Sequence, residues 1–111
     1  MNRSRTEQLR EIMARLAALT APDHDLDAEI FRALGNPAYG IALLDSDVPR
    51  YTENLHHVIK ACGGRGGWQV FEDERGTSCA FVGRGRYEKA KTPAVALCLA
   101  LLHDEIERLN V

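Results

Sequence analysis

The spacing of apolar residues predicts four helices. In three segments, apolar side chains recur every three or four positions, which is the period of a helix with one buried face. These segments predict helices over about residues 5–19, 24–34 and 53–61. A fourth helix is predicted over about residues 93–109, and it is apolar on almost every side up to Leu102. A helix of that kind is expected to be buried all round.

Polar residues at the predicted helix ends agree with this division of the chain. Ser4 and Glu7 have the spacing of a capping box, in which the serine hydroxyl accepts a hydrogen bond from a first-turn amide. Asp23 is a favourable N-cap for the second helix, and Thr52 is predicted to cap the third. Thr92 precedes a proline at the first position of the fourth helix, where the missing N–H has no cost.

Between the third and fourth helices the period changes from helical to alternating. Two short runs of alternating residues, joined through Gly76, predict a β-hairpin over residues 68–83, and a third strand is possible over residues 86–91. Residues 36–52 are irregular. Because helices and strands are segregated along the chain, we expect an α+β fold in which a small antiparallel sheet is packed by about four helices.

Composition limits the classes of protein to which the chain can belong. A length of 111 residues suits one domain, spanning residues 1–111. The net charge of −2 gives no overall attraction to nucleic acid or to an anionic membrane. The chain has no apolar run long enough to span a bilayer and no signal peptide, and its three cysteines form no CxxC pair. We therefore expect a cytoplasmic protein without a membrane partner or a disulfide framework.

Five stretches of the chain, taken together and in order, resemble the phage ABA sandwich domain, a family of small phage and prophage proteins. They are LTAPDHDLDAEIFRALG (19–35), PRYTENLHHVI (49–59), GWQVF (67–71), CAFVG (79–83) and KTPAVALCLALLH (91–103). The resemblance implies an α/β/α sandwich and a phage or prophage origin, and hence the cytoplasm of a bacterial host. It implies no reaction, because such domains have no assigned catalytic residues. Residues 36–48 depart from the family's pattern.

Two runs of residues that suggest ligand sites have simpler structural explanations. The glycine-rich run at residues 62–68 follows a helix and precedes a strand, whereas a phosphate-binding loop precedes a helix. It is expected to end a helix. The acidic run formed by Asp23, Asp25, Asp27 and Glu29 lacks the glycine and the final glutamate of a calcium loop. Helix capping and the helix dipole explain it, although an acidic patch could also meet a basic partner.

No constellation of residues points to catalysis, to a metal or to a cofactor. His103 and Glu107 are spaced as ligands on one helix with Asp104 nearby, but no third ligand comes from a predictable position. Ser78 does not lie in a nucleophile elbow, and no histidine or acid is placed to activate it. We therefore expect a protein that is not an enzyme.

The function expected from these observations is that of a protein-interaction module. Its partner would be a host or phage protein, bound through the acidic second helix, the 36–52 loop, or both. Inhibition of a host defence complex, as by anti-CRISPR proteins, is one concrete version, which rests on the phage resemblance. The candidate contact residues are Asp23, Asp25, Asp27, Tyr39, Asp45, Asp47 and Tyr51.

The alternative function is weak binding of nucleic acid through a basic segment near the third strand. Cations on such a segment, with an aromatic residue among them, could contact a nucleic-acid backbone, or they could simply protect a strand edge from pairing. The segment comprises Arg84, Arg86, Tyr87, Lys89 and Lys91.

Two further questions stay open at the level of sequence. The apolar stripe of the first helix, added to a very apolar last helix, could exceed what a small sheet covers, so a homodimer through the first helix is possible. Trp68 is expected to fill the core, and if it faced outward it would suit an interface.

Overall fold

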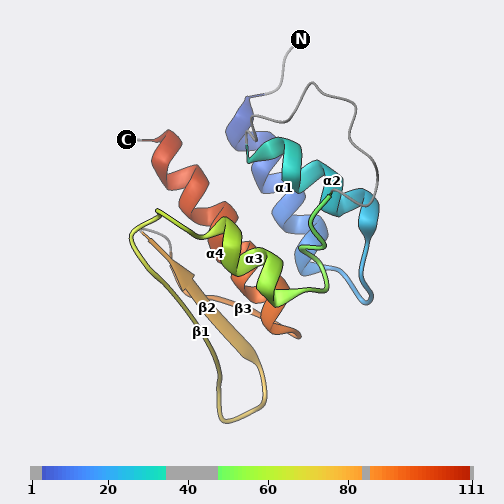
Figure 1. Ribbon diagram of the computed structural model, residues 1–111, viewed down its shortest axis with the longest axis vertical. Coiled ribbons are helices and arrows are strands. Elements are labelled where there is room, and N and C mark those ends of the chain that lie inside the picture. Colours follow the sequence, from blue (N-terminus) through green and yellow to red (C-terminus); the bar gives the residue numbers. More distant parts are fainter. Residues whose placement is uncertain (1–3, 35–47, 84–85, 111) are drawn as a thin grey trace.

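The computed structural model describes residues 4–34, 48–83 and 86–110, and it confirms the α+β class (Figure 1). The described elements are four helices and one three-stranded antiparallel sheet. In chain order they are α1 (Arg5–Ala17), α2 (His24–Ala33), α3 (Leu55–Ala61), β1 (Trp68–Glu72), β2 (Ser78–Val82), β3 (Glu88–Ala90) and α4 (Pro93–Leu109). Compared with the boundaries predicted from sequence, α1 and α2 end one or two residues earlier, α3 begins two residues later, and the third strand is shorter than 86–91.

The register of the sheet decides which side chains share a face. The strand order is β1-β2-β3, with Trp68 opposite Val82 and Ser78 opposite Ala90. Ala80 and Val82 belong to the main hydrophobic core, and their neighbours Val70 and Ala90 on the other strands pack against it. Ser78, Ala80 and Val82 therefore lie on the inner face of the sheet. The residues between them point to the opposite, outer face.

The centre of the fold is α4. It packs against all three strands on one side and against α1 and α3 on the other. Every residue from Ala94 to Leu102 is buried, which confirms the prediction made from its all-round apolar composition.

The layers are therefore the sheet, then α4, then the other helices (Figure 1). Among the described elements, helices cover one face of the sheet. α1 and α3 bury their apolar faces on α4 rather than on the sheet, and α2 packs on α1.

The apolar stripe of α1 is used inside the monomer. Leu9, Ile12 and Leu16 are buried, and α1 packs against both α4 and α2. The stripe that suggested a homodimer through the first helix is thus already covered by the chain's own helices.

Three of the four predicted N-caps are observed. Ser4 Oγ accepts from the amide of Glu7 at 3.1 Å, and Thr92 Oγ1 accepts from the amide of Val95 at 3.2 Å. Asp23 caps α2 in the same way, through its carboxylate.

The prediction that Thr52 caps the third helix is wrong, because Asn54 does so. The Asn54 Oδ1 atom accepts from the amides of His56 and His57, at 2.9 and 3.3 Å. Thr52 is buried, and its backbone N–H donates to Asp27 Oδ1 at 2.8 Å. This contact with α2 holds the chain in a turn before α3 begins.

A buried carboxylate ties the end of α4 to the connection between α3 and β1. Asp104 is fully buried, and its Oδ2 atom accepts from Arg65 Nη1 at 3.1 Å and from Arg108 Nε at 2.8 Å. Arg65 also pairs with Glu105 at 2.7 Å. The two guanidinium groups compensate a charge that would otherwise be unstable in the interior.

Candidate functional site: the outer face of the sheet

Three aromatic rings meet on the outer face of the sheet. The Tyr87 ring lies 5.9 Å from that of Phe71, centroid to centroid, at an interplanar angle of 76°. It lies 5.5 Å from the ring of Phe81, at 35°. The Tyr87 hydroxyl donates a hydrogen bond to Gln69 Oε1 at 3.0 Å. We call Phe71, Phe81 and Tyr87 the aromatic face.

The strand register explains why these residues share one side. Gln69 pairs with Phe81 and Phe71 pairs with Cys79, so all four point outward from the hairpin. On the third strand Lys89 pairs with Cys79 and also points outward. Tyr87, two residues earlier, falls on the same side. Two of the three rings, Phe71 and Phe81, therefore stand on hydrogen-bonded strands, and Tyr87 directly precedes β3.

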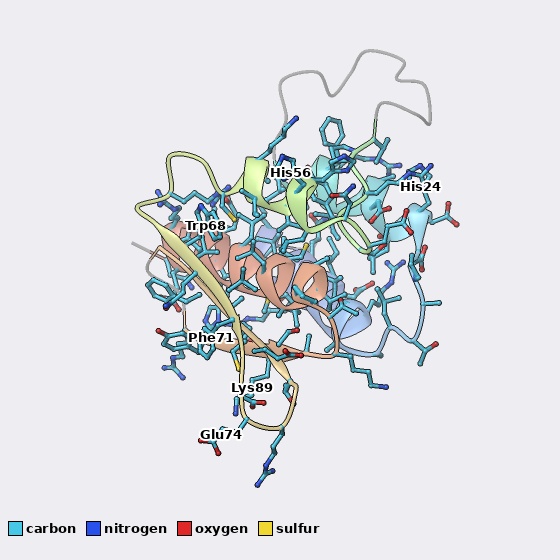
Figure 2. All side chains as sticks on the ribbon, turned by 60° about the horizontal axis from the view of Figure 1, so that its bottom comes forward. His24, His56, Trp68, Phe71, Glu74 and Lys89 are labelled. Carbon is cyan, nitrogen blue, oxygen red and sulfur yellow. The ribbon has the colours of Figure 1, made fainter. Side chains whose placement is uncertain are left out.

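The aromatic face is open to solvent. Tyr87 is 57 % exposed and Phe71 is 44 % exposed, and in the described part of the chain only α4 packs on the sheet, against its other face. Figure 2 shows Phe71 on the hairpin, well apart from α2 and α3. Clustered exposed aromatic side chains are typical of interaction surfaces, since isolated folded proteins usually cover them.

The charge beside the aromatic face is mixed. Lys89 and Arg86 are exposed cations next to Tyr87. Toward the tip of the hairpin, Lys89 lies in a shallow hollow with acidic side chains that include Glu72 and Glu74 (Figure 2). The face therefore combines apolar area with charges of both signs, which suits a protein surface better than a uniformly anionic one.

Trp68 is not the core residue expected from the sequence. It is 42 % exposed. As the first residue of β1 it lies at one end of the strand, where α4 covers it only in part. Because Trp68 pairs with Val82, its indole lies on the inner side of the sheet and is not part of the aromatic face.

The acidic candidates of the second helix have structural roles. Asp23 caps α2, and Asp27 is buried, accepting from the Thr52 amide at 2.8 Å and bonding His24 Nδ1 at 3.1 Å. Tyr51 is buried as well. Asp25 is the exposed member of the set, while the other three candidates lie outside the described residues: Tyr39, Asp45 and Asp47.

The basic candidates are divided between two places. Tyr87 and Lys89 belong to the outer side of the sheet, with Arg86 at its margin. Lys91 lies apart from them and lines a cavity near the start of α4. Arg84 is outside the described residues.

Sequence reasoning missed Phe71 and Phe81. The signal for them was present, since a hairpin over 68–83 closed near Gly76 places alternate residues of its two strands on one face. What the alternation does not reveal is which face the helices cover.

The residues considered as metal ligands around His103 are engaged in pairs. His103 Nδ1 lies 2.8 Å from Glu88 Oε1 and its Nε2 lies 3.5 Å from Glu107, while the neighbouring Asp104 is bonded to arginines. Within residues 4–34, 48–83 and 86–110, no three His, Cys, Asp or Glu side chains are placed to share a metal ion.

Two of the thiols are poorly suited to nucleophilic chemistry. Burial raises the pKa of Cys62 to about 11, and burial likewise raises the pKa of Cys98. Since the thiolate is the reactive form, both are unreactive at neutral pH.

Comparison with known proteins identifies no relative: no protein-family model, no curated protein and no solved structure matches the chain. Within the described part of the chain, no helix combines the length and the apolar character needed to cross a membrane.

Proposed function

We propose that this chain is a protein-binding module whose contact surface is the aromatic face. The observation that carries the proposal is the cluster of Phe71, Phe81 and Tyr87 on a sheet face that no described helix covers. Aromatic side chains contribute large contact areas and dominate the energetics of many protein interfaces.

The rings are already ordered in the free chain. Tyr87 contacts both phenylalanines and its hydroxyl is bonded to Gln69, so its rotamer is constrained before a partner arrives. Binding then costs less side-chain entropy than it would on a flexible loop, which favours useful affinity from a small surface.

The partner that we propose is a host or phage protein in the cytoplasm of a bacterial host, with a defence complex as the concrete case. The support for this part is the resemblance of the five stretches to phage proteins. The sequence suggested the acidic second helix as the contact surface. We propose the sheet instead, because Asp27 and Tyr51 are buried.

Single-stranded nucleic acid is a second candidate ligand. The observation that favours it is the position of Lys89 on the same side of the sheet as the three rings. Bases stack on exposed aromatic rings, and nearby cations contact phosphates.

The experiment compares three forms of the tagged full chain in bacterial lysate, each with and without nuclease, read by quantitative mass spectrometry. They are the wild type, the double variant Phe71→Ser/Tyr87→Ser, and the control Leu109→Ser. Leu109 is 40 % exposed at the end of α4, so its replacement removes a similarly exposed apolar side chain from another surface.

We expect a stoichiometric protein that survives nuclease, is retained by Leu109→Ser and is lost from the double variant. With the purified partner, the double variant should bind about thirtyfold more weakly, as loss of a hot spot does. A partner bound equally by the double variant would refute the aromatic face as the contact surface. If the captured proteins are lost after nuclease treatment, the ligand is nucleic acid rather than a protein.

A further inference from the structure

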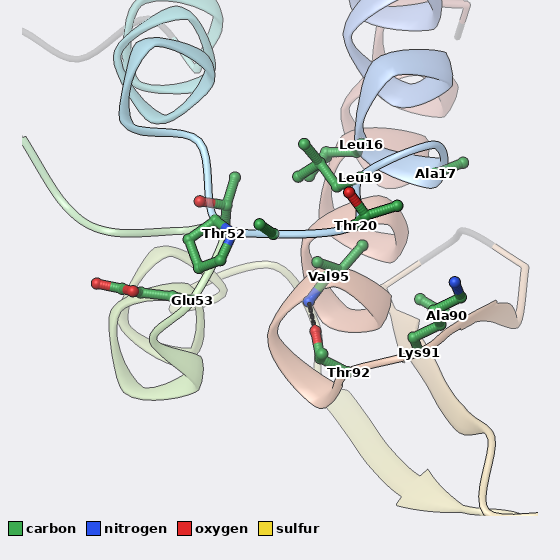
Figure 3. Close-up of a pocket in the computed structure, with 12 residues that line it drawn as sticks. Leu16, Ala17, Leu19, Thr20, Thr52, Glu53, Ala90, Lys91, Thr92 and Val95 are labelled. Carbon is green, nitrogen blue, oxygen red and sulfur yellow. Dashed lines mark hydrogen bonds between the residues drawn. The ribbon is translucent and has the colours of Figure 1, made fainter.

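A separate cavity lies between the end of α1 and the start of α4. Its volume is about 340 Å³, within the range of about 300–1,000 Å³ common for small-molecule sites. Its walls come from α1, the α1–α2 connection, the turn before α3, the end of β3 and the first turn of α4 (Figure 3). No residue of the aromatic face lines it.

Most of the wall is apolar. Side chains of Leu16, Leu19, Pro22, Ala90 and Val95 line the cavity. The Thr92 hydroxyl, which also lines it, is already used to cap α4 by accepting from the Val95 amide (Figure 3). The lining thus offers contact for an aliphatic group.

The rim carries two opposite charges that are not equivalent. Lys91 is exposed, and within the described ranges its ammonium group forms no ion pair. Glu53 lies across the cavity from it and is paired with Arg50 at 3.7 Å (Figure 3). The charge left to a ligand is therefore the positive charge of Lys91.

We infer that this cavity binds a small amphipathic carboxylate, with an aliphatic chain against Leu19, Pro22 and Val95 and the carboxylate at Lys91. The apolar wall supplies most of the affinity, because each buried methylene is removed from water. The cation supplies the preference for an anionic head group over a neutral or cationic one.

The test is to titrate the full chain with octanoate, octanol and octyltrimethylammonium. Binding is measured by isothermal titration calorimetry and by the NMR chemical shifts of Val95 and Ala90. We expect octanoate to bind most tightly and the ammonium compound least. Shortening the acid to hexanoate should weaken binding about tenfold, from the loss of two methylenes.

Two variants with a matched control locate the site. Lys91→Glu should weaken octanoate binding about tenfold and leave octanol unchanged, since only the charged head group meets the substituted residue. Ala21→Trp should fill the cavity and abolish binding of both probes. Ala18→Trp places the same ring on an exposed residue of the same connection that does not line this cavity, and it should bind as the wild type does.

Absence of a saturable octanoate isotherm at millimolar concentration would refute the inference, as would equal losses in Ala18→Trp and Ala21→Trp. Equal binding of the three head groups would refute the role of Lys91. None of these results bears on the aromatic face, so this inference and the proposed function fail or stand separately.

Discussion

Gly83 lies directly against the buried carboxylate of Asp104. A Cβ atom on Gly83 would come within 2.5 Å of Asp104 Oδ1 and equally close to the carbonyl oxygen of Arg65. The residue also has a φ of +52°, a conformation that favours glycine. The end of β2 is thereby fixed against α4, and the glycine is what permits the approach.

We expect Gly83→Ala to lower the free energy of unfolding by about 3 kcal/mol, because it adds both a steric overlap and backbone strain. Gly76→Ala is the control. Gly76 has a φ of +79°, but its nearest neighbour would be 3.8 Å from the new Cβ, so the strain alone should cost about 1 kcal/mol. Urea denaturation followed by circular dichroism measures both, and equal losses would contradict the steric account.

Asp104→Ala should destabilise the fold by about 3 kcal/mol. The substitution leaves Arg65 largely buried beside Glu105 alone and removes the bond from Arg108. Glu107→Ala, on the same helix but at a partly exposed position, should change stability by less than about 0.5 kcal/mol. Thermal melts of the two variants decide the matter, and a stable Asp104→Ala protein would show that the arginine pairs contribute nothing.

Two aspartates of the acidic run should respond very differently. Asp27→Ala removes the acceptor of the Thr52 amide and of His24, and leaves a buried amide without its partner, at a cost of about 2 kcal/mol. Asp25→Ala, at an exposed position, should cost less than about 1 kcal/mol. Chemical denaturation at pH 7 compares them. Similar losses in both would mean that the run acts through the helix dipole rather than through the contact with Thr52.

Stability should fall between about pH 10 and pH 12. Burial, with smaller effects of Cys98 and Asp27, raises the pKa of Tyr51 from 10.0 to about 12. The unfolded chain then releases this proton at a lower pH than the folded chain does. The stabilisation is complete below pH 10 and is lost as the pH rises toward 12, by about 2–3 kcal/mol in all.

Tyr51→Phe separates this effect from that of the buried thiols, because Cys62 and Cys98 also have raised pKa values and lower the stability above about pH 9. As the pH rises from 10 to 12, the unfolding free energy of the wild type should fall relative to that of the variant. A constant difference over that range would show that the phenol titrates alike in both states.

The predictions that succeeded from sequence rest on local contacts. Asp23 and Thr92 bond amides three residues away, and the hairpin follows from alternation around Gly76, so neighbouring residues contain the information. Thr52 failed as a cap because its backbone is held by Asp27, 25 residues earlier. Both Thr52 and Asn54 are residue types that favour the N-cap position, and the contact with Asp27 decides that Asn54 is the cap.

The candidate site was predictable only in part for a related reason. Tyr87 and Lys89 drew attention through charge, and alternation would have added Phe71 and Phe81. Whether their face is open depends on how the helices stack, because the faces of α1 and α3 could have covered a sheet and instead cover α4. The periodicity of a helix shows that it has an apolar side and does not identify the element against which that side packs.

The central position of α4 has a consequence for synthesis in the cell. α1, α3 and the sheet bury their apolar faces mainly on α4, yet α4 leaves the ribosome after all of them. The nascent chain therefore cannot complete its core during elongation, and the native structure must form largely after residue 109 has emerged. Until then the apolar faces of α1, α3 and the hairpin are exposed to chaperones and proteases, and the rate of α4 docking governs how much chain survives.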